Sequence, residues 1–486
     1  MTATAAEQKQ LFINNEWRPA SSGKTMDVIN PATEEVCATV PSADVDDLNA
    51  AVDAARAALN GPWGKMSARE RGRLVRKLGE RLLERVDEFA RLETLHNGKP
   101  IMESRHIEIP LAAECFEYYG GWADKVMGET IPVKGNYMNY TLREPLGVCA
   151  AIVPWNFPLL IAVWKIAPAL ATGNTIIVKP ASQTPLTALA LGEVALEVGL
   201  PPGVFNVLTG PGAKLGQAIV EHPGIDKIAF TGDTSTGKNI MRGSAETLKK
   251  ITLELGGKSP NIVLPDADID AAVRGATIGI FYGKGEVCAA GSRLLVDRSI
   301  KDEFIDKLAA RTKKMVAGDP MDPKTRFGPL SSKKQLETVM RYVESAKNEG
   351  ATLVAGGERT DIGTGKGYFY KPTVFADVKP EMTIAREEIF GPVLATIEYA
   401  DLDEAIARAN DTPYGLAAGV WTKDIKKAHY VASRLKAGTV WINTYNVYDT
   451  ASPFGGYKQS GFGREMSAHA LEHYTQVKSV WVDLNF

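Results

Sequence analysis

Hydrophobic and polar positions recur along this chain with two different periods. In the N-terminal third, apolar residues return at helical spacing between Leu74 and Phe89, directly after a capping box formed by Ser67 and Glu70. We therefore expect this third of the chain to be helical. Its apolar face packs on the rest of the protein and carries no chemistry by itself.

From Val148 onward, short apolar runs alternate with helical patterns. The runs end at Val153, Val178, Leu208, Phe230 and Leu255. This alternation is typical of βαβ units and of a parallel sheet covered by helices on both faces. For the helix after the second run we expect Thr184 as N-cap, Pro185 as the first helical residue and Gly199 at the end. The pattern predicts an α/β fold with a doubly wound nucleotide-binding domain.

Two glycine-rich segments of this region compete as the phosphate-binding turn. The segment from Gly210 to Gly216 has one residue too many for the GxGxxG pattern, which favours a plain turn. The segment from Gly232 to Lys238 resembles a Walker A loop, but Asn239 stands where a hydroxyl would hold magnesium. A kinase or ATPase is therefore disfavoured.

We favour an interpretation in which residues 232–237 form a strand-to-helix turn. Free backbone N–H groups at a helix N-terminus bind pyrophosphate without magnesium. Thr234 or Ser235 would cap this helix. The alternative is a capped helix that binds no ligand.

Three further residues have the chemistry to act on a carbonyl group. Glu254 ends an apolar strand that opens into two glycines, where a doubly wound sheet binds ligand, so it is a candidate general base. Cys288 follows two glycines and is expected on the first turn of a helix, whose dipole would favour the thiolate. Asn156 lies between two prolines, a rigid mount for an oxyanion donor. The alternatives are a surface carboxylate and an inert buried thiol.

Composition narrows the class of protein. With 486 residues, of which 44% are hydrophobic and 23% charged, the chain should form about three globular domains. Its 56 basic and 58 acidic side chains give a net charge of −2, which disfavours binding to nucleic acid or anionic lipid. The four cysteines, Cys37, Cys115, Cys149 and Cys288, form no CxxC pair, so we expect reduced thiols and no metal site. The first ten residues lack a secretory signal and no stretch approaches the roughly 18 apolar residues of a membrane span, so we expect a soluble cytoplasmic protein.

Nine sequence blocks, taken in order, resemble the aldehyde dehydrogenase superfamily along essentially the whole chain. They are PWNFP (154–158), WKIAPAL (164–170), KPASQTP (179–185), FTGDTSTGK (230–238), LELGGK (253–258), GEVC (285–288), EEIFGPV (387–393), NDTPYGL (410–416) and SPFGGYKQSGFGRE (452–465). The resemblance is greater to the tetrameric aldehyde and betaine-aldehyde dehydrogenases than to the acylating branch, which uses coenzyme A.

The resemblance implies an α/β fold of three parts. Residues 1–122 and 146–257 would form a Rossmann-like cofactor domain, and residues 258–457 an α/β catalytic domain. Residues 123–145 and 458–486 would form a small β oligomerisation unit. The tail VKSVWVDLNF reads as an exposed alternating strand that pairs with another subunit, so we expect a homotetramer, with a dimer as the second choice.

The resemblance also implies a non-acylating, NAD(P)-dependent aldehyde dehydrogenase. Cys288 would attack the aldehyde, and the Asn156 amide and the Cys288 backbone N–H would bind the oxyanion of the thiohemiacetal. Glu254 would activate the water that cleaves the thioester. Lys165 resembles the lysine that orders the site; its alternative is a surface lysine.

For the cofactor, the resemblance assigns Lys179 to the adenine ribose and Glu388 with Phe390 to the nicotinamide ribose. The remaining cofactor positions are Trp155, Ser182, Gly212, Phe230, Gly232, Thr234, Gly237, Leu255 and Gly256. Relatives that prefer NAD often carry Glu where Ser182 stands, and a carboxylate would repel a 2′-phosphate. We therefore expect NAD to be used and NADP to be tolerated.

The tunnel to Cys288 is expected to be aromatic. Its matching positions are Phe157, Trp164, Tyr282, Tyr448 and Phe454. Such a tunnel favours medium-chain aliphatic and arylalkyl aldehydes by area and amino aldehydes by cation–π attraction, whereas no arginine pair is evident to bind a semialdehyde acid.

Two departures from the family pattern bear on this site. Glu286 stands where Gln is common, and it should point away from the thiol or pair with Lys284. Asp233 replaces a Ser of the phosphate turn and would disfavour pyrophosphate if its side chain faced it. Other functions stay open: a coenzyme-A-dependent acylating dehydrogenase, a cysteine hydrolase, and a non-enzymatic use of the fold.

Overall fold

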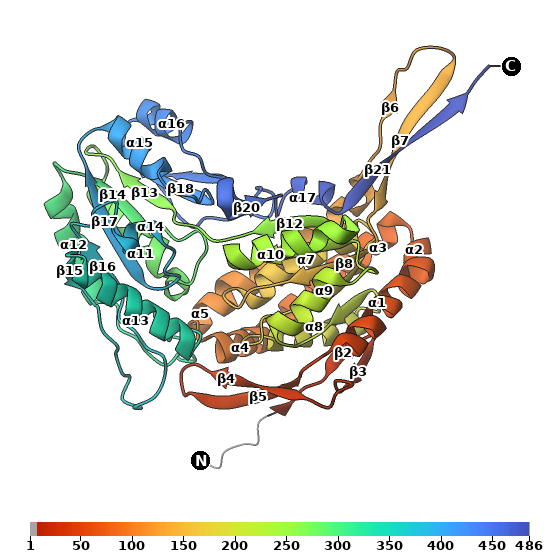
Figure 1. Ribbon diagram of the computed structural model, residues 1–486, viewed down its shortest axis with the longest axis horizontal. Helices are drawn as coiled ribbons and strands as arrows, with labels where there is room; N and C mark the ends of the chain where they lie inside the picture. The colour runs from red at the N-terminus through yellow and green to blue at the C-terminus, as the bar shows by residue number, and fades with distance from the viewer. Residues whose placement is uncertain (1–6, 486) are drawn as a thin grey trace.

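The computed structural model describes residues 7–485, and two large sheets with helices packed on them organise it (Figure 1). The eight-stranded sheet runs, in spatial order, β20 (Gly461–Phe462), β12 (Lys250–Glu254), β11 (Lys227–Thr231), β8 (Val148–Ile152), β9 (Thr175–Lys179), β10 (Phe205–Val207), β2 (Leu11–Ile13) and β3 (Glu16–Arg18). The seven-stranded sheet runs β15 (Thr352–Ala355), β16 (Thr373–Ala376), β17 (Val393–Tyr399), β14 (Arg293–Asp297), β13 (Pro260–Val263), β18 (Ala417–Trp421) and β19 (Thr439–Ile442). The predicted α/β class is confirmed.

Two three-stranded sheets and the helices complete the fold. One small sheet contains β1 (Glu7–Gln8), β5 (Glu35–Pro41) and β4 (Thr25–Asn30), and the other contains β21 (Thr475–Asp483), β7 (Tyr137–Pro145) and β6 (Thr130–Ile131). Before β6 lie α1 (Val45–Asn60), α2 (Pro62–Lys65), α3 (Ala68–Glu84), α4 (Val86–Asn97), α5 (Ile101–Glu103), η1 (Ser104–Glu108), α6 (Ile109–Trp122) and η2 (Ala123–Lys125). Between β8 and β12 lie α7 (Pro158–Ala171), α8 (Leu186–Glu197), η3 (Gly212–Gly216), α9 (Gln217–Glu221), α10 (Thr234–Ser244) and η4 (Ala245–Thr247). After β13 come α11 (Ile269–Phe281), η5 (Tyr282–Gly285), α12 (Lys301–Lys313), α13 (Lys333–Asn348), α14 (Thr383–Arg386), α15 (Leu402–Asn410), α16 (Ile425–Ala432), η6 (Lys458–Ser460) and α17 (His469–Glu472).

The prediction that the N-terminal third is helical is wrong for residues 7–41. This segment forms strands, and β2 turns directly into β3 at Asn14 and Asn15, whose φ angles are 57° and 61°. Asparagine tolerates such left-handed conformations, and two in succession make the tight turn of a β-hairpin. Helices begin at α1, and the predicted capping box of Ser67 and Glu70 does start α3.

The parallel strands β8 to β12 all end at one edge of their sheet. Ile152 pairs with Lys179, and Thr231 pairs with Glu254, so the loops that follow these residues lie together. The chain moves outward from β8 through β9 to β10, then returns to pair β11 on the other side of β8. The crevice beyond the carboxyl ends of β8 and β11 is therefore the place where a doubly wound sheet binds ligand.

Helix starts in this region differ by a residue or two from the prediction. Helix α8 begins at Leu186 with Pro185 at the N-cap, and the Leu186 N–H donates to Nδ1 of His96 at 3.2 Å. A side chain from α4 therefore supplies the acceptor that Thr184 was expected to supply. The segment from Gly210 to Gly216 is a π-helical turn that leads into α9, instead of a plain turn.

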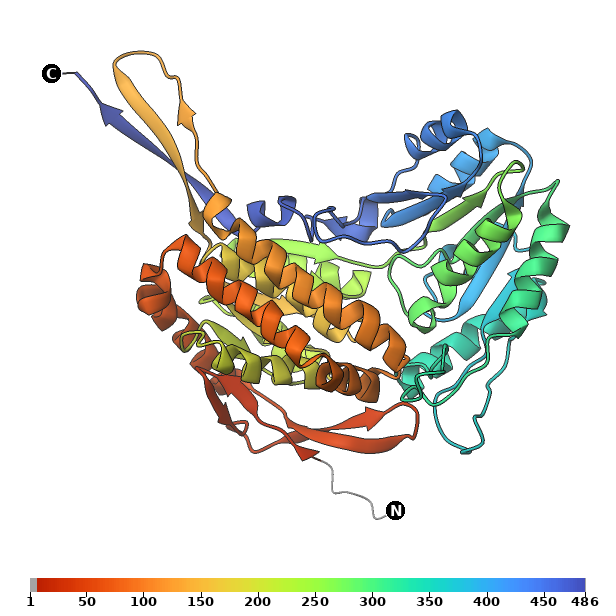
Figure 2. The same ribbon diagram turned by 180° about the vertical axis from the view of Figure 1, so that it is seen from behind.

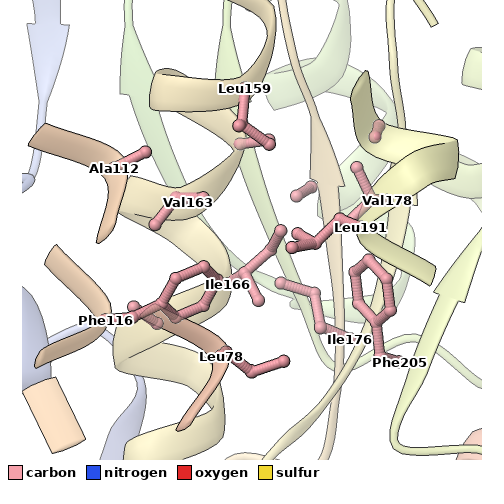
Figure 3. Packing of buried hydrophobic residues seen from close by; sticks show 14 of the residues in the cluster. Leu78, Ala112, Phe116, Leu159, Val163, Ile166, Ile176, Val178, Leu191 and Phe205 are labelled. Carbon is pink, nitrogen blue, oxygen red and sulfur yellow. The ribbon is translucent and has the colours of Figure 1, made fainter. Parts of the chain in front are cut away.

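The central core lies between this sheet and the helices α3, α6 and α7 (Figure 3). All residues of α7 except Trp164 are buried, so the helix packs on neighbours all round. The residues drawn and labelled there are Leu78, Ala112, Phe116, Leu159, Val163, Ile166, Ile176, Val178, Leu191 and Phe205. This packing fixes α7, whose first turn follows the loop that carries Asn156.

Strands β7 and β21 extend away from the body of the molecule (Figure 2). The C-terminal segment also contributes to the large sheet, because β20 pairs with β12 at Leu253 and Glu254. The predicted domain boundaries stay a prediction. Within residues 7–485, no helix has the length and apolarity that a membrane crossing requires. Residues 1–6, part of the segment in which a signal peptide was sought, lie outside the described residues.

Candidate active site

Cys288 lies in the wall shared by two cavities. One has a volume of about 280 Å³ and lies at the carboxyl ends of β8, β11 and β12. The other has a volume of about 440 Å³ and lies between α6, α7 and the segment around Tyr448. A reagent in either cavity therefore lies against the same cysteine.

The smaller cavity is lined by six segments of the chain: residues 154–156, 231–233, 255–256, 288, 335–338 and 388–390. Its lining includes six of the predicted cofactor residues: Trp155, Gly232, Leu255, Gly256, Glu388 and Phe390. Oε1 of Glu388 accepts a hydrogen bond from the Gly257 N–H at 2.9 Å, and burial raises the pKa of Glu388 to about 7. A Cβ on Gly256 would lie 2.1 Å from Oε2 of Glu388, so any other residue here would displace this carboxyl group.

The turn before α10 is capped by Asp233, and not by Thr234 or Ser235 as predicted. Oδ1 of Asp233 accepts hydrogen bonds from the Thr236 N–H at 3.0 Å and from the Ser235 hydroxyl at 2.6 Å. Burial acts to raise the pKa of Asp233, but these hydrogen bonds outweigh it and hold the pKa below its usual value. Asp233 therefore brings a negative charge to the edge of the smaller cavity, which it also lines.

The other predicted cofactor residues do not line this cavity. Ser182 donates to the Gly210 carbonyl at 3.1 Å, which brings the loops after β9 and β10 together beside Lys179 and Gly212. Burial lowers the pKa of Lys179 to about 8, and its Nζ donates to the Pro180 carbonyl at 3.1 Å.

The remaining three predicted cofactor residues, Phe230, Thr234 and Gly237, lie in or beside the turn that begins α10. The ring of Phe230 fills the space where a Cβ on Gly232 would stand, at 2.4 Å. Gly237 lets α10 approach Leu255 closely, since a Cβ there would lie 2.6 Å from that side chain. Oγ1 of Thr234 is buried and has no hydrogen-bond partner among residues 7–485.

The larger cavity brings all five predicted tunnel aromatics together: Phe157, Trp164, Tyr282, Tyr448 and Phe454. Phe157 stacks on Tyr282 with ring centroids 6.2 Å apart, and Phe454 contacts both Trp164 and Tyr448. His106 and Glu114 also line this cavity. These two residues were not predicted from the sequence, because they lie on η1 and α6, whose helical pattern does not indicate a binding site.

Cys288 follows η5 in a turn, and not on the first turn of a helix as predicted. No helix N-terminus therefore stabilises a thiolate here. Burial, together with repulsion from the carboxyl groups of Glu388 and Glu254, raises the pKa of Cys288 to about 12. The thiol is protonated at neutral pH in this arrangement.

Asn156 is buried in the loop between β8 and α7. Its Nδ2 donates to the carbonyl of Glu286 at 2.9 Å, which joins this loop to the segment that carries Cys288. An amide nitrogen carries two hydrogens, so one remains for an oxyanion at the thiol.

Glu254 ends β12 and is buried. Neither of its carboxyl oxygens has a hydrogen-bond partner among residues 7–485, and the group lines neither cavity. Burial, followed by repulsion from Glu465, raises its pKa well above the usual value. A Cβ on Gly455 would lie 2.7 Å from Oε1 of Glu254, so glycine is required beside this carboxyl group.

Lys165 is fully buried and is not the surface lysine of the alternative interpretation. Its Nζ donates to Thr231 Oγ1 at 2.7 Å and to the carboxylate of Glu465. This contact joins residues 300 positions apart, so nothing in the sequence pattern predicts that Glu465 lies beside Lys165. No group of three His, Cys, Asp or Glu side chains that could hold a metal ion occurs within the described part of the chain.

Comparison with known proteins assigns the family. The model described as "Aldehyde dehydrogenase family" matches residues 17–480. The chain belongs to the aldehyde dehydrogenase family. This aldehyde dehydrogenase is 49% identical to the mitochondrial aldehyde dehydrogenase of Homo sapiens, over 97% of this chain and 92% of that protein.

Solved structures agree with this assignment and with the fold. The NAD⁺ complex of an aldehyde dehydrogenase from Bacillus cereus is 52% identical with a TM-score of 0.97, covering 99% of this chain and 97% of that one. An indole-3-acetaldehyde dehydrogenase in complex with NAD⁺ is 44% identical with a TM-score of 0.96, covering 99% of this chain and 98% of that one. The resemblance and the fold predicted from the sequence are confirmed.

Proposed function

We propose that this aldehyde dehydrogenase converts an aldehyde to a carboxylic acid through a covalent thioester on Cys288. The observation that carries the proposal is the position of Cys288 in the wall between the two cavities. The smaller cavity suits the nicotinamide end of NAD, since it has backbone turns, a carboxyl group for ribose hydroxyls and aromatic faces at Trp155 and Phe390. NAD held there by these residues would supply the acceptor for the hydride that leaves the aldehyde carbon.

In this proposal each residue of the site has a separate role in the reaction. Glu254 first takes the proton of the Cys288 thiol, and the sulfur then adds to the carbonyl carbon. The Asn156 amide and the Cys288 backbone N–H donate to the oxygen as it becomes negative. Glu254 removes a proton from the water that attacks the thioester. Burial and repulsion from Glu465 raise the pKa of Glu254 above its usual value, which strengthens it as a proton acceptor. Lys165 orders this side of the site through Thr231 and Glu465.

We propose that NAD is used and that NADP is tolerated. The NAD⁺ complexes of the two relatives support the first part. Ser182, at the loop that follows Lys179, supports the second part because it offers a hydroxyl where a carboxylate would repel a 2′-phosphate. Lys179, Ser182 and Gly212 are proposed to hold the adenosine half of the cofactor.

The substrates proposed are medium-chain aliphatic, arylalkyl and amino aldehydes. The larger cavity is lined mostly by aromatic and aliphatic side chains, and its lining within the described residues includes Glu114 but no Lys or Arg. A carboxylate on the substrate would therefore find no lysine or arginine there. The name of one relative, an indole-3-acetaldehyde dehydrogenase, fits the arylalkyl class.

We propose a cytoplasmic homotetramer in which β21 pairs with another subunit, and we keep the predicted domain boundaries. A coenzyme-A-dependent acylating dehydrogenase is the second candidate within the family, and Glu254 argues against it because that chemistry needs no hydrolytic base.

The test is an absorbance assay of reduced nicotinamide over an aldehyde panel, with NAD and NADP, beside Cys288→Ala. We expect hexanal and phenylacetaldehyde to be turned over better than succinic semialdehyde, and activity to be lost in the variant. Cys37→Ala is the matched control, because Cys37 contacts the Val28 carbonyl in the small N-terminal sheet and should keep wild-type activity. Dehydrogenase activity in Cys288→Ala would overturn the proposal.

A further inference from the structure

A buried ring of polar contacts lies behind the two cavities and joins the loops that carry Asn156 and Cys288. It begins at Lys284, whose Nζ donates to the Asn97 carbonyl at 2.8 Å and to Asn97 Oδ1 at 2.7 Å. Nδ2 of Asn97 donates in turn to the carbonyl of Trp155 at 2.7 Å. Lys284 is thereby connected to the peptide that precedes Asn156.

Glu286 closes the ring. Its carbonyl accepts the hydrogen bond from Asn156 Nδ2 at 2.9 Å, and its carboxylate lies 2.9 Å from Nζ of Lys284. The other carboxylate oxygen accepts from the Ser331 N–H at 3.0 Å and from the Ser331 hydroxyl at 3.2 Å. The side chain points away from the thiol and into the ion pair, one of the two arrangements expected from the sequence.

The backbone that carries this ion pair is strained. Gly283, Lys284 and Gly285 have φ angles of 55°, 63° and 74°, so three successive residues are left-handed. Lys284 has a Cβ, which disfavours that region. A Cβ on Gly285 would lie 2.4 Å from the Gly391 backbone, so the chain passes tightly here. Such a conformation persists only where surrounding contacts fix it, and the Lys284 side chain makes those contacts.

A second buried lysine holds the same loop from the other side. Nζ of Lys99 donates to the Asn156 carbonyl at 2.9 Å and lies 4.7 Å from the centre of the Phe157 ring. Its charge is balanced by Glu93 at 3.3 Å and by Glu108. Asn156 is therefore fixed at its carbonyl by Lys99 and at its side chain by Glu286.

We propose that Lys284 and Glu286 are positioning residues for the oxyanion donor. Neither side chain lines a cavity, so neither touches substrate or cofactor. Their ion pair fixes the Glu286 carbonyl, which takes one of the two amide hydrogens of Asn156 and aims the other toward the carbon that Cys288 attacks. The inference rests on the proposed roles of Cys288 and Asn156.

The test compares two reactions of the same thiol in the full-length enzyme. Hydrolysis of p-nitrophenyl acetate passes through an oxyanion at Cys288, whereas alkylation by iodoacetamide is displacement at a saturated carbon and forms none. We expect Lys284→Gln and Glu286→Gln each to lower kcat for ester hydrolysis and for aldehyde oxidation by about tenfold or more, the size typical of a weakened oxyanion donor. KM and the alkylation rate should stay within about threefold.

The double variant Lys284→Gln/Glu286→Gln should recover most of kcat, because two neutral amides can bond to each other without a buried unpaired charge. An effect of charge on the thiol alone would move the two single variants in opposite directions. The exposed pair of Lys307 and Glu303, 3.0 Å apart, supplies the matched control, and its two Gln variants should behave as wild type.

Several outcomes would overturn the inference: wild-type ester hydrolysis in both single variants, a double variant no better than the singles, or alkylation that falls in parallel with hydrolysis. If the single variants fail to fold, the variant Ser331→Ala tests the inference in their place. It removes one hydroxyl from Glu286 and should lower ester hydrolysis about threefold at constant alkylation, and unchanged hydrolysis contradicts the inference. Failure of the proposed function itself would show separately, as activity in Cys288→Ala.

Discussion

At the scale of single residues, the chemistry of the site depends on groups whose protonation is set by burial. Cys288 and Glu254 both have raised pKa values, so neither is ionised to its usual extent in the folded chain. Negative carboxylates near a thiol disfavour the thiolate, because the two charges repel each other. Ionisation of Cys288 is therefore expected to respond to the neutralisation of its neighbours.

The first prediction concerns Glu388. Because this carboxyl group raises the pKa of Cys288, Glu388→Gln should lower that pKa and speed alkylation by iodoacetamide at pH 8 by about two- to fivefold. In the wild-type enzyme without cofactor, the alkylation rate should rise about tenfold per pH unit between 7 and 10, since the pKa lies above that window at about 12. Glu381→Gln, at an exposed site, is the control. A slower reaction in Glu388→Gln would contradict this account.

Ser182 carries the second prediction, on cofactor choice. Ser182→Glu should lower kcat/KM with NADP by about tenfold or more, because the carboxylate repels the 2′-phosphate, while kcat/KM with NAD stays within about threefold. Initial rates with both cofactors at one aldehyde concentration measure the ratio. Ser22→Glu, in an exposed N-terminal turn, should leave it unchanged. An unaltered ratio in Ser182→Glu would place the 2′-phosphate elsewhere.

At the scale of elements, the N-cap of α10 shows that one residue, Asp233, can stabilise a helix and at the same time disfavour the binding of an anion. Asp233 caps the helix and also brings a carboxylate to the cavity where a pyrophosphate would approach. Its pKa is lowered, so the stabilisation by the ionised cap is present above its ordinary pKa of 3.8 and is lost as the pH falls through the lower folded value.

Two variants of Asp233 separate these effects. Asp233→Ser keeps a capping oxygen and removes the charge, so it should lower KM for NAD with little change in stability. Asp233→Ala also loses the cap and should reduce the free energy of unfolding by about 1 kcal/mol. Urea denaturation and cofactor titration measure the two quantities. If Asp233→Ser raises KM for NAD, the carboxylate does not disfavour cofactor binding and this account is wrong.

Comparison of the predicted with the observed elements shows how much can be predicted from the sequence alone. Asn156, Glu254 and Cys288 were predicted because each follows a local signal of strands, glycines or prolines, and the five tunnel aromatics were predicted by resemblance; their roles stay a prediction. The partners that hold them were not found, since the Asn156–Glu286 bond spans 130 positions and the Lys165–Glu465 pair spans 300. The N-terminal strands β2 and β3 were missed because each has three residues, and only the Asn14-Asn15 turn indicates them. Strands β4 and β5 are longer, with six and seven residues, but the helical pattern farther along was extended over them.

At the scale of the whole molecule, β7 and β21 present apolar side chains to solvent in a single chain. Trp481 is 59% exposed and Val477 is 57% exposed on β21, while Met138 is 45% exposed on β7. An exposed strand edge with such side chains is prone to pair with another chain. This is the surface through which we expect the homotetramer to form.

The last prediction tests that surface. Trp481→Lys should shift the molar mass in light scattering from that of a tetramer toward a dimer or monomer, because a charge is then buried at the contact. Met340→Lys, on α13, changes a similarly exposed apolar residue at 42% exposure and should leave the mass unchanged. A tetramer that persists in Trp481→Lys would exclude β21 as the contact.

The two cavities that meet at Cys288 have a consequence for the order of events. In the proposed function, a dinucleotide and an organic substrate would come to Cys288 from different cavities, so neither would have to depart before the other arrives. A bulky compound bound in one cavity would block that cavity alone. Blockers of the two cavities should therefore occupy the enzyme together, and the oxidised product can diffuse out while the spent nucleotide is still in place.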